Sequence, residues 1–103
     1  MANNNFSPIP NALVTQTVTN TAAGIAVGSI PAGARYAEGY VRTASIVETR
    51  DQTTPTALIG NQWDAGDIIY LRSRDEITGF QAIEQGGGST EKIDWQFFNI
   101  SPE

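Results

Sequence analysis

The sequence contains no cysteine and no histidine. Without cysteine, the chain can form neither a disulfide bond nor a thiolate metal site. Without histidine, it lacks the commonest zinc ligand and the commonest general base, and a Ser-His-Asp triad is impossible. We therefore expect no enzymatic activity, no cofactor and no bound metal, and we look for function in the surface of the fold.

Basic residues are also scarce. Six Lys and Arg residues against eleven Asp and Glu residues give a net charge of -5, which argues against a nucleic acid or an anionic membrane as partner. No apolar run approaches the roughly 18 residues of a membrane helix. The first ten residues, MANNNFSPIP, lack the basic and apolar regions of a signal peptide. The sequence thus predicts a protein made in the cytoplasm.

Strand-like runs dominate what is present. The chain has 103 residues, of which 40% are hydrophobic, and this fits one globular domain. No window repeats apolar residues at i, i+3, i+4 and i+7 over three turns, as an amphipathic helix requires. Short β-branched runs instead recur about every ten residues between Gly and Pro. This pattern predicts an all-β fold: a small antiparallel β-sandwich, jelly-roll-like or immunoglobulin-like, with about seven to eight strands.

The N-terminal segment differs from the rest. Pro8 and Pro10 remove backbone donors there and favour extended geometry. We expect an extended N-terminal arm over residues 1–11 and a single β-sandwich domain over residues 12–103. The arm is either a frayed terminus or a segment that lies on a neighbouring subunit, and the sequence leaves both interpretations open.

Alternation and β-branched residues locate the expected strands. They cover residues 12–21, 25–29, 38–50 with a bulge near 44–45, 57–59, 67–73, 79–85 and 92–99. The glycines at 86–88 favour a flexible turn, which predicts that residues 80–84 and 92–99 pair as a hairpin. In the last strand, Ile93, Trp95 and Phe97 share one face, and we expect that face in the core.

The stretch LRSRDEITGF, residues 71–80, concentrates charge. Ser73 and Glu76 have the capping-box spacing, in which each side chain satisfies the backbone N–H of the other residue. This predicts a one-turn helix near residues 73–77. Ile77 and Phe80 would then close one end of the core.

Two chemical alternatives for the acidic residues are weaker. Asp75 and Glu76 are adjacent and point in different directions, whereas paired glycosidase carboxylates must face each other, so a partner such as Asp64 or Asp67 would have to fold close by. A calcium site through Asn61, Asp64 and Asp67 lacks the closing Glu of an EF-hand loop. We favour a turn at Asp64–Asp67 that leads into a strand.

Arginines are spread over the predicted strands and the corner. They could form a small basic stripe, but we expect them to pair with acidic residues on solvated faces or across subunits. The arginines in question are Arg42, Arg50, Arg72 and Arg74, and the expected acidic partners are Glu38, Glu48 and Asp75.

Residues 36–98 resemble a group of small proteins encoded among phage and prophage structural genes. The residues that carry the resemblance are Tyr40, Val41, Thr43, Ala44, Ile46, Asp51, Thr54, Pro55, Thr56, Ala57, Gly60, Gly66, Asp67, Ile69, Leu71, Ser73, Arg74, Glu76, Ile77, Phe80, Ala82 and Ile83. Gln52 departs from the pattern, because Gly is more usual there. The matching motifs are structural rather than catalytic.

The resemblance implies a virion protein of the capsid cement, or head-decoration, type. Such a protein assembles in the host cytoplasm and binds the major capsid protein on the outer head surface. It forms a homo-oligomer, expected to be a trimer on the local threefold axes.

Contacts with the partner are expected from apolar residues in the arm and at loop ends. The candidates are Phe6, Ile9, Leu13, Tyr36 and Trp63. A tail adaptor, tail-tip or fibre-associated module is the first alternative function. A carbohydrate-binding module that stacks sugars on Trp63 or Trp95 is the second, although Trp95 shares its face with core residues.

Overall fold

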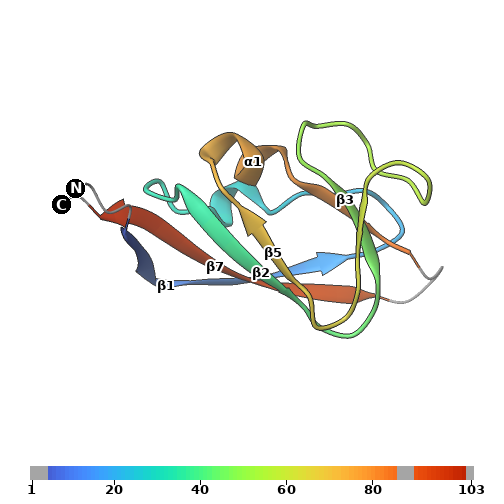
Figure 1. Ribbon diagram of the computed structural model, residues 1–103, viewed down its shortest axis with the longest axis horizontal. Coiled ribbons are helices and arrows are strands. Elements are labelled where there is room, and N and C mark those ends of the chain that lie inside the picture. The colour runs from blue at the N-terminus through green and yellow to red at the C-terminus, as the bar shows by residue number, and fades with distance from the viewer. Residues whose placement is uncertain (1–4, 86–89, 102–103) are drawn as a thin grey trace.

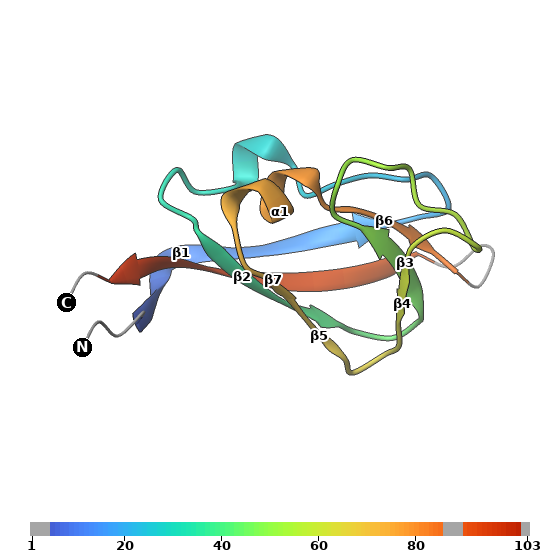
Figure 2. The same cartoon turned by 45° about the horizontal axis from the view of Figure 1, so that its top comes forward.

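The computed structural model describes residues 5–85 and 90–101 of the chain. They form two antiparallel sheets packed as a small β-sandwich with one short α-helix (Figure 1 and Figure 2). The elements in chain order are β1 (Asn5–Val18), η1 (Val27–Ser29), β2 (Tyr36–Val41), β3 (Ile46–Thr49), β4 (Asn61–Trp63), β5 (Ile68–Leu71), α1 (Arg74–Gly79), β6 (Gln81–Glu84) and β7 (Glu91–Ser101). The predicted all-β sandwich is confirmed.

The strand order is β1-β7-β2-β5 in the larger sheet and β4-β3-β6 in the smaller one. The first and last strands pair antiparallel, from Asn5 opposite Ser101 to Val18 opposite Glu91. Figure 1 shows β1 and β7 running side by side along the long axis of the molecule. This pair is the longest in the fold, and it carries β2 and then β5 on its other side.

The core lies between the two sheets and under α1. Trp95, in the centre of β7, is fully buried, and its ring meets Phe80 edge-on with the ring centroids 5.0 Å apart. The indole N–H of Trp95 donates to Gln16 Oε1 over 2.8 Å, and the Gln16 amide donates to the Ala23 carbonyl. Ile93 and Phe97 are buried beside Trp95. The prediction that this face of β7 enters the core is therefore confirmed.

Small residues in β2 make room for the Trp95 ring. Gly39 lies opposite Trp95 in the neighbouring strand. A Cβ atom on Gly39 would lie 2.5 Å from the indole ring, which is closer than real Cβ contacts. The core-facing side of β2 therefore carries Ala37, Gly39 and Val41, and its larger side chains point the other way.

The single strand predicted over residues 38–50 is wrong. The chain forms β2 and β3 instead, which belong to different sheets. At the break, the Glu91 carboxylate accepts from the backbone N–H of Thr43 at 2.9 Å and from the Thr43 hydroxyl at 2.8 Å. Thr43 is thereby fixed to a side chain rather than to a neighbouring strand.

Two short predicted strands are also wrong. Residues 25–29 contain the 3-10 turn η1. Ile25 before the turn is buried while Val27 is exposed, whereas residues two apart in a strand would share one face. Residues 57–59 form a tight turn held by backbone bonds between Thr56 and Ile59 in both directions. The strand that pairs with β3 is β4, a few residues later.

The predicted hairpin between residues 80–84 and 92–99 is wrong. β6 pairs with β3 in the smaller sheet, whereas β7 pairs with β1 and β2 in the larger one. The glycines at 86–88, which suggested the hairpin turn, lie outside the described residues.

The first strand begins earlier than predicted and ends earlier. β1 starts at Asn5, and residues 5–8 pair with residues 98–101 of β7. The register shifts between Pro8 and Leu13, where the prolines interrupt the ladder. The expected arm thus runs as a strand against its own chain from Asn5 onward, and residues 1–4 lie outside the described part.

Candidate functional site on the outer face of the sheet

The larger sheet has a second face, which points away from the core and is called the outer face below. Because side chains alternate along a strand, the residues between the core positions lie there. The register aligns Glu38 of β2 with Gln96 of β7 and with Tyr70 of β5, and it aligns Tyr40 with Asp94 and Ile68. Leu13 of β1 lies opposite Gln96, so all four strands contribute to the outer face.

Large apolar side chains remain exposed on this face. The exposed fraction is 67% for Leu13, 47% for Tyr40, 43% for Ile68 and 39% for Tyr70. A shallow hollow of about 310 Å³ lies among four strands, and its lining residues are Leu13, Glu38, Tyr40, Ile68, Asp94 and Gln96. Burial of such side chains against a partner releases free energy of roughly 25 cal/mol per Å² of apolar area. Folding does not account for their position on the surface, so they are candidates for contact with a partner.

Aromatic rings extend the outer face toward the end of the sheet near the termini. Tyr36 stacks on Tyr70 with ring centroids 6.3 Å apart and packs against Phe98 at 5.5 Å. The Tyr36 hydroxyl donates to Glu38 Oε2 over 3.1 Å. Burial, together with the hydrogen bond and negative charge of Glu38, raises the pKa of Tyr36 to about 12. The phenol therefore stays protonated, and its ring is held in a fixed orientation.

A charged group borders the hollow. Arg42 binds Asp94 through two hydrogen bonds of 2.6 and 2.7 Å, and Thr15 donates to the same carboxylate over 2.9 Å. The Arg42 guanidinium lowers the pKa of Asp94, helped by the Thr15 hydrogen bond against a smaller opposing effect of burial. An apolar centre with paired charges at its border is the usual arrangement of a protein-binding surface.

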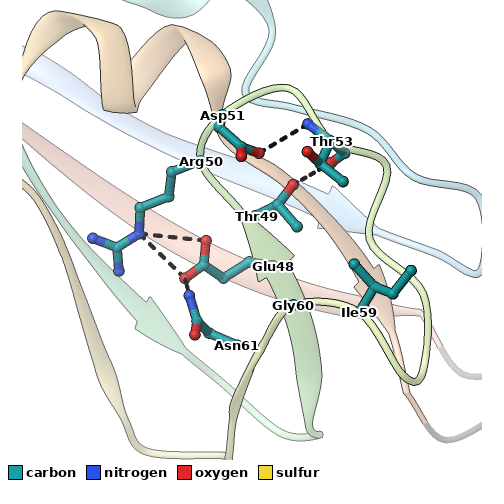
Figure 3. Close-up of a pocket in the computed structure, with 8 residues that line it drawn as sticks. All are labelled: Glu48, Thr49, Arg50, Asp51, Thr53, Ile59, Gly60 and Asn61. Atoms are coloured by element: carbon teal, nitrogen blue, oxygen red, sulfur yellow. Dashed lines mark hydrogen bonds and ion pairs between the residues drawn. The ribbon is translucent and has the colours of Figure 1, made fainter.

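A second hollow, of about 440 Å³, lies over the smaller sheet beside the loop that follows β3 (Figure 3). Its main polar feature is Glu48, which is fully buried. The Glu48 carboxylate accepts from Arg50, from the Asn61 amide and from the Trp63 indole N–H, at 3.0 to 3.4 Å. Arg50 also donates to the Tyr70 carbonyl and to Glu76. Because Glu48 already accepts from three side chains, we interpret it as a structural anchor that joins β3, β4 and the edge of β5.

The corner at residues 71–80 forms the predicted helical turn. The Ser73 side chain accepts from the Glu76 backbone N–H over 3.1 Å, and Ile77 and Phe80 are buried. One half of the predicted capping box is wrong, because Glu76 accepts from the backbone N–H of Arg72 rather than from that of Ser73. The cap joins the helix to the end of β5.

The loop that was considered for calcium forms an Asp turn. Asp67 accepts from the backbone N–H of Asp64 over 2.7 Å, while Asp64 accepts from Ser45 and Gln62. Within residues 5–85 and 90–101, no group of three or more acidic side chains is placed to hold a metal ion. Asn61 instead donates to Glu48.

Gln52 occupies the position where the resemblance favours glycine. Its φ is +70°, and it is the one non-glycine residue with positive φ in the described part of the chain. Left-handed backbone costs a residue with a Cβ roughly 1 kcal/mol. The loop geometry is thus the one that glycine would adopt, and this chain holds it with glutamine.

The arginines follow the predicted pairing in part. Arg50 pairs with Glu48, which was an expected partner, but Glu48 is buried rather than on a solvated face. Arg42 pairs with Asp94, which was not among the expected partners. Arg74 donates to the carbonyls of Pro31 and Ala34, and so fastens the loop before β2 to α1.

The five predicted contact residues do not gather at one place. Leu13 and Tyr36 lie on the outer face. Ile9 and Trp63 are half-buried and pack against the core. Phe6 lies in β1 opposite Ile100, and its side chain lies outside the described part of the structure.

Sequence reasoning missed Tyr40, Ile68 and Tyr70. For Tyr40 the sequence did contain a signal, because large residues alternate with the small residues Ala37 and Gly39 in its strand. Small residues can pack beneath a large core ring, as Gly39 does beneath Trp95, and Tyr40 must then point away from the core. The signal was absent for β5, where all four residues are apolar and no alternation shows which face is exposed.

The two tryptophans differ in exposure. Trp95 is fully buried, and Trp63 is half-buried with its indole N–H bonded to Glu48.

Comparisons of the chain with protein-family models, with curated proteins and with solved structures gave no match. Across the described residues, no helix has the length and apolar character needed to cross a membrane.

Proposed function

We propose that the protein is a structural binding protein of a bacteriophage particle, a capsid cement protein that attaches to the major capsid protein through the outer face. The observation that supports this most is the exposure of Leu13, Tyr40, Ile68 and Tyr70 on one face of a regular sheet. The resemblance of residues 36–98 to phage structural proteins supplies the kind of particle. The trimer implied by the same resemblance stays a prediction.

The outer face suits a contact that must hold its shape. Its side chains project from four paired strands rather than from loops, so little conformational entropy is lost on binding. Tyrosine is enriched in protein interfaces because it combines a large apolar ring with a polar end. Tyr36, Tyr40 and Tyr70 supply this chemistry on neighbouring strands.

The proposed contact differs from the arm contact expected at first. Residues 5–8 pair with β7 of the same chain, and Ile9 packs against the core. A deletion of residues 2–10 would remove part of β1 along with the expected arm. The deletion would therefore lower stability, and it cannot serve as a clean test of attachment.

The test uses particles released from a host that encodes the chain. Quantitative mass spectrometry of purified particles should find the protein at a copy number comparable to that of the major capsid protein. A count close to that of a tail component would instead favour the tail module, and absence from particles would overturn the proposal.

The contact surface is tested with a matched pair of substitutions. Ile68→Asp places a carboxylate in the lining of the hollow on the outer face and should abolish binding to particles that lack the protein. Leu58→Asp makes the same kind of change on a loop side chain that is 96% exposed and away from this face, and it should leave binding unchanged. Equal binding by both variants would show that the outer face is not the contact.

A further inference from the structure

We propose that the free edge of β1 pairs with the same edge of a second copy, antiparallel and across a twofold axis at Thr15. The two four-stranded sheets would then become one continuous sheet. The inference concerns the isolated chain, and it does not depend on attachment to a phage particle.

The edge follows from the strand order. β1 is the terminal strand of the larger sheet, with β7 on one side and no strand on the other side within the described residues. Figure 2 shows β1 extending beside β7 over most of the length of the molecule. An edge strand of this length presents a row of backbone donors and acceptors, which is a template for another strand.

The register tells which residues face outward. The Arg42 N–H bonds to the Lys92 carbonyl, so the backbone of Lys92 points toward β2. Backbone groups alternate in direction along a strand, so Ile93, the next residue, points toward β1 and its partner Gln16. The residues on either side of Gln16, which are Thr15 and Thr17, therefore direct their N–H and C=O groups away from the sheet.

Intramolecular contacts limit this edge to a short stretch. The Thr19 carbonyl, which has the same direction as Thr15 and Thr17, accepts from the Glu84 N–H in β6. On the other side, the register shift and the prolines interrupt the strand before Leu13. Leu13, Thr15 and Thr17 are the outward-directed residues that remain between these limits.

These three residues are complementary to themselves. In an antiparallel pair centred on Thr15, Thr15 meets its own copy and Leu13 meets Thr17 in both directions. All three then form hydrogen-bonded pairs, with about six bonds in total. Threonine pairs and threonine with an aliphatic residue are favourable neighbours across strands.

The charge distribution favours contact at this edge. The chain has a net charge of -5, yet its first charged side chain is Arg35. Natural edge strands are commonly protected by charged residues or prolines. In β1 the prolines protect only the first half, and no charged side chain protects Leu13 to Val18. The charged side chains nearest to this edge belong to β7, where Asp94 is paired with Arg42 and Lys92 donates to Thr17, so β1 itself brings no charge into the contact.

The first test measures association of the purified chain by sedimentation velocity up to about 1 mM, the range of weak contacts. The wild type should form a dimer. Thr15→Pro removes an outward N–H without touching the ladder to β7, and it deletes two of the bonds across the axis. It should weaken the dimer by about tenfold or more. Thr15→Val keeps the backbone donor and should leave the dimer intact.

The second test does not depend on how well the proline variant folds. The chain has no cysteine, so Thr15→Cys introduces a single thiol. Hydrogen-bonded antiparallel partners have Cα atoms about 5.5 Å apart, within the range of a disulfide. Under mild oxidation this variant should form a covalent dimer much faster than Thr54→Cys, an exposed threonine on the loop beside the smaller sheet.

The outcomes separate this inference from the proposed function. A monomer at all concentrations, with equal cross-linking of the two cysteine variants, would overturn the edge pairing and leave the outer-face contact open. A trimer that Thr15→Pro does not affect would also overturn it and would favour the trimer expected from the resemblance. A dimer sensitive to Thr15→Pro, in a chain absent from phage particles, would support the pairing alone.

Discussion

The two faces of the larger sheet are made by the same four strands, yet their apolar residues are in opposite situations. On the inner face, Trp95, Ile93 and Phe97 are fully buried. On the outer face, Tyr40 and Ile68 are close to half exposed, although each lies one position from a buried residue. The burial of the inner residues is explained by folding, whereas the outer residues need a different explanation. The comparison therefore separates residues that hold the sandwich together from residues available to a partner.

The largest expected effect is on the inner face. Trp95→Ala would leave a large cavity against Phe80 and remove the donor to Gln16 Oε1, and it should lower the free energy of unfolding by about 3–5 kcal/mol. Trp95→Phe should cause a smaller loss because it keeps a ring. Urea denaturation followed by far-UV circular dichroism measures both, and a loss below about 1 kcal/mol for the alanine variant would contradict the assigned core.

A smaller effect is expected where the inner face is tight. Gly39→Ala places a methyl group 2.5 Å from the Trp95 ring, and the repacking should cost about 1–3 kcal/mol. Gly33→Ala is the matched control, because nothing lies within 4 Å of the added Cβ atom. Thermal unfolding should show a lower midpoint for Gly39→Ala only. Equal midpoints would mean that β2 does not press against Trp95.

The two faces also differ in how they hold a carboxylate. Burial works to raise the pKa of Glu91, but hydrogen bonds from the Lys92 and Thr43 backbone and the Thr43 hydroxyl outweigh it and lower the pKa. The pKa of Asp94 on the outer face is lowered mainly by Arg42. A carboxyl group with a lowered folded-state pKa adds stability above its unfolded pKa, near 4, and that stability is lost as the pH falls through the folded pKa.

Glu91→Gln should therefore destabilise the protein at pH 7 by about 1–3 kcal/mol. Below about pH 5, the free energy of unfolding of this variant should fall less steeply with decreasing pH than that of the wild type. Asp94→Asn should change the same profile less, because its ion pair is exposed to solvent. Urea midpoints from pH 7 to about pH 2 measure the two profiles. A larger effect for Asp94→Asn would reverse the proposed difference between the faces.

The smallest effect on stability is expected on the outer face. Tyr40→Ser and Ile68→Ser remove side chains that are about half exposed, and each should lower the free energy of unfolding by only about 1 kcal/mol. The same variants should nevertheless weaken binding to a particle. If either variant destabilised the fold by several kcal/mol, its side chain would belong to the structural core, and the contrast between the faces would fail.

Part of the fold could be predicted from local sequence. The alternation of Ile93, Trp95 and Phe97 identified a core-facing strand, and the spacing of Ser73 and Glu76 identified a capped helical turn. These features depend on residues close together in the chain, so short-range patterns are enough to find them.

The errors arose where a distant residue decided the local structure. The break between β2 and β3 lies where the carboxylate of Glu91, nearly fifty residues away, accepts hydrogen bonds from Thr43. The glycine-rich stretch suggested a hairpin, but β6 and β7 lie in different sheets. Of the predicted contact residues, Leu13 and Tyr36 lie on the outer face, whereas Ile9 and Trp63 pack against the core. Which residues of a sheet are exposed depends on the strand register, and a local sequence pattern does not give that register.

The pairing of Asn5 with Ser101 brings the two ends of the β1–β7 ribbon to one tip of an elongated molecule, 46 Å by 24 Å by 24 Å (Figure 1). The domain could therefore be inserted into a surface loop of another protein, because the two connections to that protein would lie at neighbouring points. A fluorophore carried on a fusion at either end would report the same tip. If the protein attaches to a capsid as proposed, the distance of that fluorophore from a label on the capsid would tell whether the molecule stands upright or lies flat.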